Sequence, residues 1–241
     1  MALTGKLFSD KTTLPYWWIV LFTWGMIIYY LTFSGTVAAY FCQYIMMDVT
    51  KSSVILTAEK IAVLGSLVVL VPILVPRMSK RGMMITGAII TGAGHLIVLI
   101  DPTSLPLAIA ASILRGIGIG PCFGTITAFI ADTIEYSHWK SGVRADGLGY
   151  SACTLGQKFN GGIAAYVFGL LLSHSGYDGT LPDQAEVTKD MILNIYAFSP
   201  AFFFGIIVLL MFAYRLEKHI PEIMEDIKAG KTGEDRSDIM C

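Results

Sequence analysis

Long apolar stretches without charged residues recur along this chain and limit what it can fold into. A helix needs roughly 20 apolar residues to cross a bilayer core about 30 Å thick. Such stretches occupy most of the sequence: Thr12 to Met47, Ile61 to Pro76, Gly82 to Ile100, Pro102 to Leu114 and on from Gly116 to Ala131, Gly147 to Tyr177 apart from Lys158, and Met191 to Tyr214. We therefore predict an all-α membrane protein.

The lengths of these stretches predict a bundle of about six transmembrane helices. Their approximate ranges are 14–46, 52–76, 82–100, 104–132, 146–174 and 192–216, and residues 217–241 are expected to form a charged cytoplasmic tail. Of the 241 residues, 54% are hydrophobic and only 15% are charged, whereas soluble domains carry about a quarter charged residues. The four scattered cysteines show no CxxC spacing and are expected to be small core residues.

The positions of Lys and Arg predict that both termini are cytoplasmic, because inner loops of membrane proteins carry an excess of these residues. With both ends inside, the outer loops hold only Lys51 and Lys189. The inner segments hold Lys6, Lys11, Arg77, Lys80, Arg81, Lys140, Arg144, Arg215, Lys218, Lys228, Lys231 and Arg236.

Two patterns of side chains repeat at helical spacing. Small residues recur every four positions in the fourth segment, at Ser112, Gly116, Gly120, Gly124 and Ala128, which predicts close packing of another helix. Pro121 beside this ridge is expected to bend the helix, as a moving carrier would need. Aromatic residues recur in the first segment around Tyr40, either as one wall of a sugar site or as packing and interface residues.

Basic residues within the expected spans are the most informative, because ionisable groups at membrane depth are costly and mark functional sites by default. Lys158 lies about 12 residues into its helix and thus roughly 18 Å deep. Thr154, one turn earlier, and Gln157 beside it extend a polar wall of the kind that lines a carrier's substrate cavity. A bundle-stabilising ion pair is the alternative for Lys158.

Arg115 is similarly deep in the fourth segment, and no acidic residue is expected at matching depth. Glu59 and Lys60 lie only about 10 Å from the outer end of their helix and point to different faces, so we expect them to reach the interface or separate partners. The counter-charge of Arg115 is therefore expected on another polypeptide, with a structural ion pair as the alternative. His95 is expected to be only hydrogen-bonded.

One run of residues resembles a known family. Ala131-Asp132-Thr133-Ile134-Glu135-Tyr136 is followed by Trp139-Lys140, by Gly142-Val143-Arg144-Ala145-Asp146-Gly147 and by Gln157-Lys158. This run resembles the glycoside-pentoside-hexuronide:cation symporters, the melibiose carrier group of the major facilitator superfamily. The Tyr40 to Tyr44, Arg77 to Gly82 and Ser175-Gly176-Tyr177 segments extend the likeness over nearly the whole chain, which resembles only the C-terminal half of a 12-helix member.

The resemblance implies one six-helix bundle of a sugar:cation symporter that works by alternating access in a bacterial-type inner membrane. It implies that Lys158 couples the cation and sugar sites, that Thr154, Gln157 and Tyr40 line the sugar pocket, and that Phe123 forms an aromatic wall. Family members such as the melibiose carrier have tryptophan at the Phe123 position and glutamine at the Cys153 position. Na⁺ or H⁺ is expected to bind mainly to carboxylates of the missing N-terminal half, and no other cofactor is expected.

The resemblance also implies that charged residues after the fourth segment form a cytoplasmic gate against the other half, with an ordinary solvated loop as the alternative. These residues are Asp132, Glu135, Tyr136, Lys140 and Arg144. The expected partners are a sugar or glycoside, the lipid bilayer and an N-terminal half, but no nucleic acid.

Two rival functions belong to other classes. A truncated remnant or a membrane subunit that binds a partner would transport nothing by itself. An intramembrane enzyme is poorly supported, because the sequence holds no Ser/His pairing, HExxH motif or paired helix carboxylates. We therefore expect a transporter half and no enzymatic activity.

Overall fold

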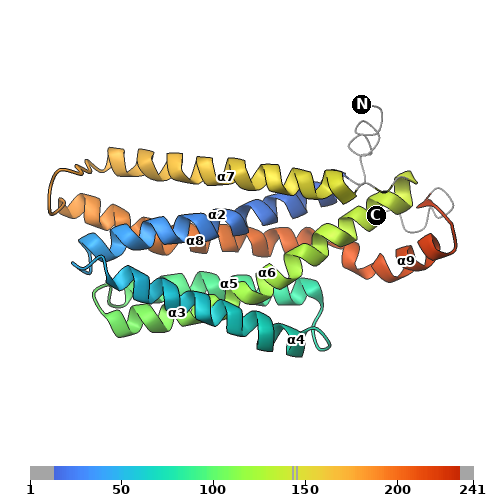
Figure 1. Cartoon of the computed structure of the whole chain (residues 1–241), viewed down its shortest axis with the longest axis horizontal. Helices are drawn as coiled ribbons and strands as arrows, with labels where there is room; N and C mark the ends of the chain where they lie inside the picture. The colour runs from blue at the N-terminus through green and yellow to red at the C-terminus, as the bar shows by residue number, and fades with distance from the viewer. Residues whose placement is uncertain (1–13, 143, 145, 234–241) are drawn as a thin grey trace.

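Helices account for nearly all of the chain that the structure, a computed structural model, describes: residues 14–142, 144 and 146–233 (Figure 1). The long helices are α2 (Leu14–Tyr44), α5 (Lys80–Leu96), α6 (Leu105–Ser141), α7 (Asp146–His174) and α8 (Glu186–Ala213). A sixth rod joins α3 (Lys51–Gly65), a π-helical stretch (Ser66–Leu70) and α4 (Val71–Leu74). A 3₁₀ turn (Ile97–Leu99) extends α5, and another (Leu216–Lys218) precedes α9 (Ile220–Lys228).

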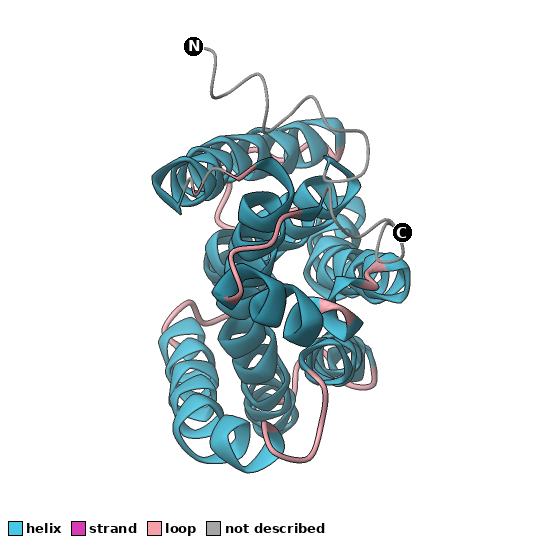
Figure 2. Ribbon diagram, turned by 90° about the vertical axis from the view of Figure 1, so that its right-hand side faces the viewer, coloured by secondary structure: helices cyan, strands magenta, loops and turns pink. Residues whose placement is uncertain are grey.

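The long helices pack as one bundle with α6 and α2 at its centre. Helix α6 packs between α3 and α5. Helix α5 also packs against α8, and α2 contacts both α8 and α7. Figure 2 looks along this bundle, where the described chain contains helices and loops and no strand. Helix α7 lies along one edge and packs mainly on α2 (Figure 1).

Five of these helical rods are long and apolar enough to cross a membrane: α2, the α3–α4 rod, α5 with its 3₁₀ turn, α6 and α8. Helix α7 has the required length but carries Gln157, Lys158 and Asn160 among its glycines, and its crossing stays a prediction. Large apolar side chains such as Val68, Leu155 and Phe202 are exposed on the outer surfaces. The chain is therefore a helical, multi-pass membrane protein.

The end of the bundle where α6 stops differs from the sequence-based expectation. Helix α6 does not end near residue 132 but continues to Ser141, because its last turns bury Tyr136 and Trp139. It ends at Gly142, whose φ of 68° and N–H bond to the His138 carbonyl form a left-handed cap.

The segment expected as a cytoplasmic tail contains a packed helix. Ile223 of α9 is buried, and Ile220 and Ile227 pack partly buried against the same core. These positions share one face of a helix, and α9 uses that face to contact α6. Residues 234–241 lie outside the described part, as do Lys6, Lys11 and Arg236, which contributed to the predicted orientation.

Three of the cysteines confirm the expectation of small core residues, since Cys42, Cys122 and Cys153 are free and buried. Cys241 lies outside the described part of the chain.

The small-residue ridge of α6 confirms the predicted close packing. Gly116 faces the Glu59 carbonyl and Ala62, Gly120 faces Ser66, and Gly124 faces Val71, so the ridge receives the α3–α4 rod along its length. On another face, Gly118 meets Gly87 and Thr91 of α5. Because lipid supplies no hydrophobic force between helices, this backbone proximity is what van der Waals attraction requires.

Pro121 is accommodated within α6 by a bond from the neighbouring rod. Proline has no N–H to donate to the carbonyl four residues earlier, which is that of Ile117. The Ser66 hydroxyl, at the start of the π-helical stretch, donates to this carbonyl over 2.9 Å. Helix α6 thus remains one helix from Leu105 to Ser141.

We expect Gly116→Ala to lower the free energy of unfolding by about 1–3 kcal/mol, the usual cost of overpacking a close contact. A Cβ at this position would lie 2.5 Å from the Glu59 carbonyl oxygen. Thermal unfolding in detergent micelles measures the change. The matched control is Gly205→Ala in α8, where a Cβ would meet nothing within 4 Å; equal losses in the two variants would contradict the packing account.

Candidate functional site

A buried polar cluster joins five helices in the interior of the bundle. Its members are Tyr30 of α2, Glu59 of α3, His95 of α5, Arg115 of α6 and Tyr196 of α8. Arg115 Nη2 lies 3.3 Å from Glu59 Oε2, and both side chains are only 1% exposed. Arg115 Nη1 donates to the Tyr196 hydroxyl over 2.8 Å, and the Tyr30 hydroxyl donates to Glu59 Oε1 over 3.0 Å.

The expectation that Arg115 finds its counter-charge on another polypeptide is therefore wrong. Helices α3 and α6 both begin at the same end of the bundle (Figure 1), and Glu59 and Arg115 lie at similar distances from those beginnings. The ridge at Gly116 brings the two backbones together, and the long arginine side chain spans the remaining difference in depth. Glu59 does not reach the interface, whereas Lys60 beside it is 52% exposed.

His95 is a hydrogen-bonded core residue, as expected. Its Nδ1 lies 3.0 Å from the Tyr196 carbonyl oxygen, and its ring packs edge-on against Tyr30 and Tyr196. The cluster thus ties α2, α3, α5, α6 and α8 together, while α7 contributes no member. We interpret it as the centre that holds these five helices as one body.

Two residues of the polar wall predicted for α7 lie together on an open face of the bundle. Lys158 and Thr154 line a shallow cavity of about 430 Å³ together with Tyr150, Ser151 and Leu155. Lys158 is exposed, and no carboxylate within the described ranges lies at ion-pair distance from it. Gln157 is partly buried and lies outside this lining. The structure therefore brings together two of the residues predicted to bind sugar.

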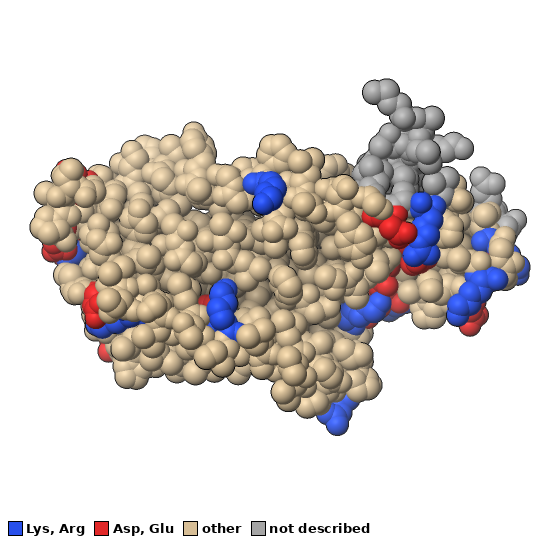
Figure 3. Space-filling model, viewed as in Figure 1, with Lys and Arg blue, Asp and Glu red and all other residues tan. Residues whose placement is uncertain are grey.

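The same face carries few charges midway along the bundle. Figure 3 shows one isolated basic patch over the middle of α7 and another over the middle of α3. Lys158 is the only Lys or Arg of α7, and Lys60 is the only one in the middle of α3. Both lysines therefore stand alone on a largely uncharged surface.

The other two predicted sugar-binding residues lie elsewhere. Phe123 of α6 is partly buried, with its ring centre 6.2 Å from that of Trp24. Tyr40 packs against Phe168 and Tyr177, with ring centres 5.1 and 5.7 Å apart. Neither lines the cavity of Lys158, and the aromatic stripe of α2 serves packing.

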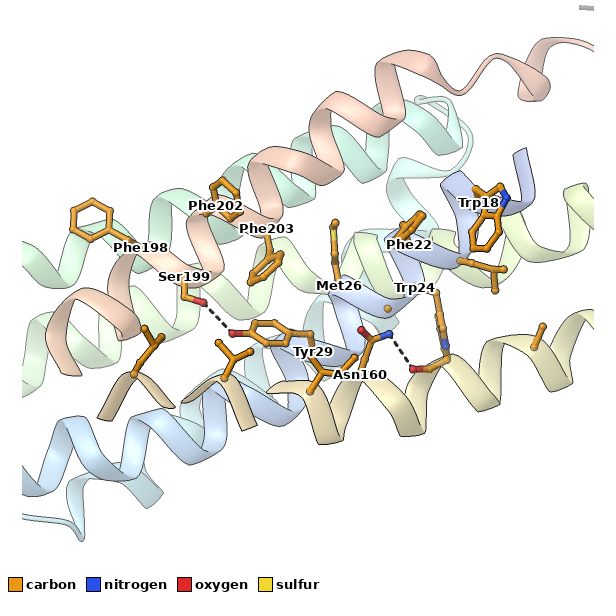
Figure 4. A pocket seen from close by; sticks show the side chains of 17 residues that line it. Trp18, Phe22, Trp24, Met26, Tyr29, Asn160, Phe198, Ser199, Phe202 and Phe203 are labelled. Atoms are coloured by element: carbon orange, nitrogen blue, oxygen red, sulfur yellow. Dashed lines mark hydrogen bonds between the residues drawn. The ribbon is translucent and has the colours of Figure 1, made fainter. Parts of the chain in front are cut away.

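A larger apolar pocket of about 860 Å³ was not predicted from the sequence. It lies between α2, α7 and α8 (Figure 4), and its aromatic lining includes Trp18, Phe22, Phe198 and Phe202. The α7 residues that line it are different from those beside Lys158 and lie on another face of the helix. Aromatic pairs spaced four residues apart, Trp18 with Phe22 and Phe198 with Phe202, were the available sequence signal.

The residues predicted to form a cytoplasmic gate make ion pairs within this chain. Lys80 Nζ lies 2.7 Å from Asp132 Oδ2, and Arg144 Nη2 lies 2.9 Å from Glu135 Oε1. Arg144 Nε also contacts Asp146 over 2.8 Å, and these carboxylates raise the pKa of Arg144.

The alternative of an ordinary solvated loop is wrong for Glu135, Tyr136 and Lys140, which belong to α6 together with Asp132. The Tyr136 ring is buried between Tyr16 and Trp139, and Lys140 Nζ lies 5.9 Å from its centre.

Two partners at this end were missed from the sequence. Lys80 was counted only as a loop charge, and Glu217 was assigned to the tail. Glu217 accepts the N–H groups of Lys80 and Arg81 over 2.6 and 3.1 Å, so it occupies the positive end of the α5 dipole. The basic turn before α5 was a signal for an acidic partner, but it did not identify which one.

We expect Glu59→Leu to lower the free energy of unfolding by about 3–5 kcal/mol, because removing one member of a buried ion pair leaves the other charge uncompensated. Denaturation in detergent micelles measures the loss. Lys60→Leu, which changes the exposed neighbour, is the matched control and should have little effect. The double variant Glu59→Leu/Arg115→Met should be more stable than Glu59→Leu. Equal losses of stability in Glu59→Leu and Lys60→Leu would disprove the pairing.

Comparison with known proteins places this chain among transporters. The family model described as MFS/sugar transport protein matches residues 2–218. The isoprimeverose transporter of Lactiplantibacillus pentosus is 32% identical over 216 residues, which cover 88% of this chain and 44% of that protein. The glucuronide carrier protein homolog of Escherichia coli (strain K12) is 28% identical over 193 residues, covering 78% of this chain and 41% of the relative.

A putative sulfoquinovose importer of Salmonella typhimurium is 27% identical over 200 residues, covering 82% of this chain and 42% of the relative. This chain thus spans less than half the length of the curated relatives that it matches. Since the family model covers nearly the whole chain, the chain belongs to the MFS/sugar transport protein family.

Proposed function

We propose that this chain supplies the C-terminal half of a sugar:cation symporter that works by alternating access. The observation that carries this proposal is Lys158, which is exposed midway along α7 beside Thr154 and has no carboxylate partner in the described part of the chain. A lysine at membrane depth requires water or a counter-charge. An aqueous cavity closed by a second half meets both requirements.

Sugar is the substrate class that the relatives support, since they include proteins named for isoprimeverose and glucuronide. Thr154 and Gln157 would contact sugar hydroxyls from α7. Neither Phe123 nor Tyr40 lines the cavity of Lys158. Their roles in the sugar pocket therefore rest on the family resemblance alone. The chain's relatives are transporters, and we assign it no enzymatic reaction.

Coupling would act through the charge of Lys158. Na⁺ or H⁺ bound mainly by carboxylates of the N-terminal half would change the field at this ammonium group, so that sugar affinity depends on cation occupancy. Such coupling is reciprocal: bound sugar changes cation affinity by the same factor. This division of labour gives the N-terminal half a specific chemistry, namely acidic residues at membrane depth facing α7.

The inner end of the bundle would act as the cytoplasmic gate, in a cell membrane with both termini cytoplasmic. The pairs Lys80–Asp132 and Glu135–Arg144 hold α6 to its neighbours in the present arrangement. Arg144 is solvent-accessible and already divided between Glu135 and Asp146. Exchange of its carboxylate partners is a low-cost way for the two halves to meet and separate.

We expect vesicles that hold this chain with a matching N-terminal half to accumulate sugar when a Na⁺ or H⁺ gradient is imposed. Radiolabelled isoprimeverose and a glucuronide are suitable first substrates. Lys158→Ala should reduce gradient-driven uptake about tenfold or more, because a hydrogen bond to a charged group contributes about 1.5–3 kcal/mol to binding. Lys228→Ala, an exposed change on α9, should leave uptake unchanged.

Full uptake by Lys158→Ala would rule out its coupling role. If this chain binds the N-terminal half but the pair shows no gradient-driven uptake of any tested sugar, the partner-binding, non-transporting alternative is favoured instead.

A further inference from the structure

A basic pocket lies at the end of the bundle where α8 stops and α5 begins. Its volume is about 220 Å³, and its lining is Ser79, Arg81, Tyr214, Arg215, Glu217 and Lys218. Three of these side chains are cationic and one is anionic. The pocket is separate from the cavity of Lys158 and from the ion pairs assigned to the gate.

The single carboxylate of this pocket is already engaged. Both Glu217 oxygens accept backbone N–H groups at the start of α5, from Lys80 and from Arg81. Arg215 and Lys218 are exposed and form no ion pair with any residue in the described ranges. The pocket therefore keeps an excess of positive charge.

Arg81 is held in place by Phe212. Its Nη2 donates to the Phe212 carbonyl over 3.2 Å, and its guanidinium carbon lies 5.5 Å from the centre of the Phe212 ring. Its Nε is buried and therefore closed to a ligand. The bond to Phe212 and the contact with its ring hold the guanidinium in the wall of the pocket, where a planar fork of donors suits an oxyanion.

The surroundings place this pocket at the surface of the bilayer. Leu209 and Phe212, in the last turns of α8, are 68% and 59% exposed, as lipid-facing side chains would be. Helix α8 ends at Ala213, and the exposed Arg215 follows directly. Charged residues gather at this end of the bundle, whereas the surface beside them is largely uncharged (Figure 3). An anion here would meet basic side chains on one side and an apolar helix surface on the other.

We propose that this pocket binds the phosphate of an anionic phospholipid headgroup. Arg81, Arg215 and Lys218 would surround the phosphate, and the acyl chains would lie along the exposed apolar surface of α8. Basic pockets beside membrane helices recognise anionic headgroups in this way. The adjoining apolar surface favours a lipid over a soluble phosphate, which would gain nothing from it. This inference requires only that the chain is in a membrane and does not depend on sugar transport.

Native mass spectrometry of the full chain in detergent micelles tests the proposal, with phosphatidylglycerol or phosphatidylcholine added at equal concentration. We expect preferential retention of phosphatidylglycerol. The double variant Arg215→Gln/Lys218→Gln should weaken this retention roughly thirtyfold, the effect expected when two basic residues at a membrane surface are removed. The matched control, Lys228→Gln/Lys231→Gln, removes the same charge from exposed positions on and after α9, outside the pocket.

Equal losses in the two double variants would overturn the assignment to this pocket, because only net charge would then matter. Equal retention of the two lipids would overturn recognition of an anionic headgroup. A third arm adds inorganic phosphate in place of lipid: displacement of phosphatidylglycerol by millimolar phosphate would identify a soluble-anion site and overturn the lipid proposal. Circular dichroism of each variant confirms that it is folded before retention is compared.

Discussion

The ion pair between Glu59 and Arg115 is the interaction on which the rest of the bundle depends. Both groups are almost completely buried, and either one alone at this depth would carry a large desolvation penalty. In a membrane, where lipid and side chains are equally apolar, many helix arrangements have similar packing energies. An arrangement that separates these two charges is strongly disfavoured, so the pair specifies how α3 is positioned against α6.

The small residues of α6 make that pair possible, and the tyrosines extend it. Gly116 allows the α3 backbone to approach so closely that a methyl group would not fit, and Tyr30 and Tyr196 then bond to the two charged groups from α2 and α8. The polar cluster thereby joins five helices, α2, α3, α5, α6 and α8, in one unit. Helix α7 stays outside this unit and packs mainly on α2, which leaves Lys158 on an open face. The five joined helices thus form a support on which α7, the helix that bears Lys158, is less constrained.

Charges at the end of the bundle where α5 begins and α6 stops serve a different purpose from the buried pair. Lys80, Asp132, Glu135 and Arg144 are paired within the chain but remain closer to solvent, where an exchange of partners is inexpensive. The same end holds α9 against α6 and contains the pocket lined by Arg81.

Much of the helical framework could be predicted from the sequence because it depends on local properties. The apolar stretches around α2, α5 and α8, the four-residue spacing of Gly116, Gly120 and Gly124, and the isolation of Lys158 in α7 require only knowledge of neighbouring residues. The end of α6 could not be predicted in this way: Asp132 and Glu135 read as loop charges, yet Tyr136 and Trp139 gain buried partners that continue the helix to Ser141.

The sequence by itself determined that this chain forms long apolar helices, because the length needed to cross a bilayer is a property of each segment alone. Only the tertiary structure decided that Arg115 pairs with Glu59. The physical reason is that an ion pair depends on the approach of two side chains within a few ångströms. The close contact of Gly116 in α6 with the α3 backbone sets that distance. The positions of the two residues along their own helices do not predict it.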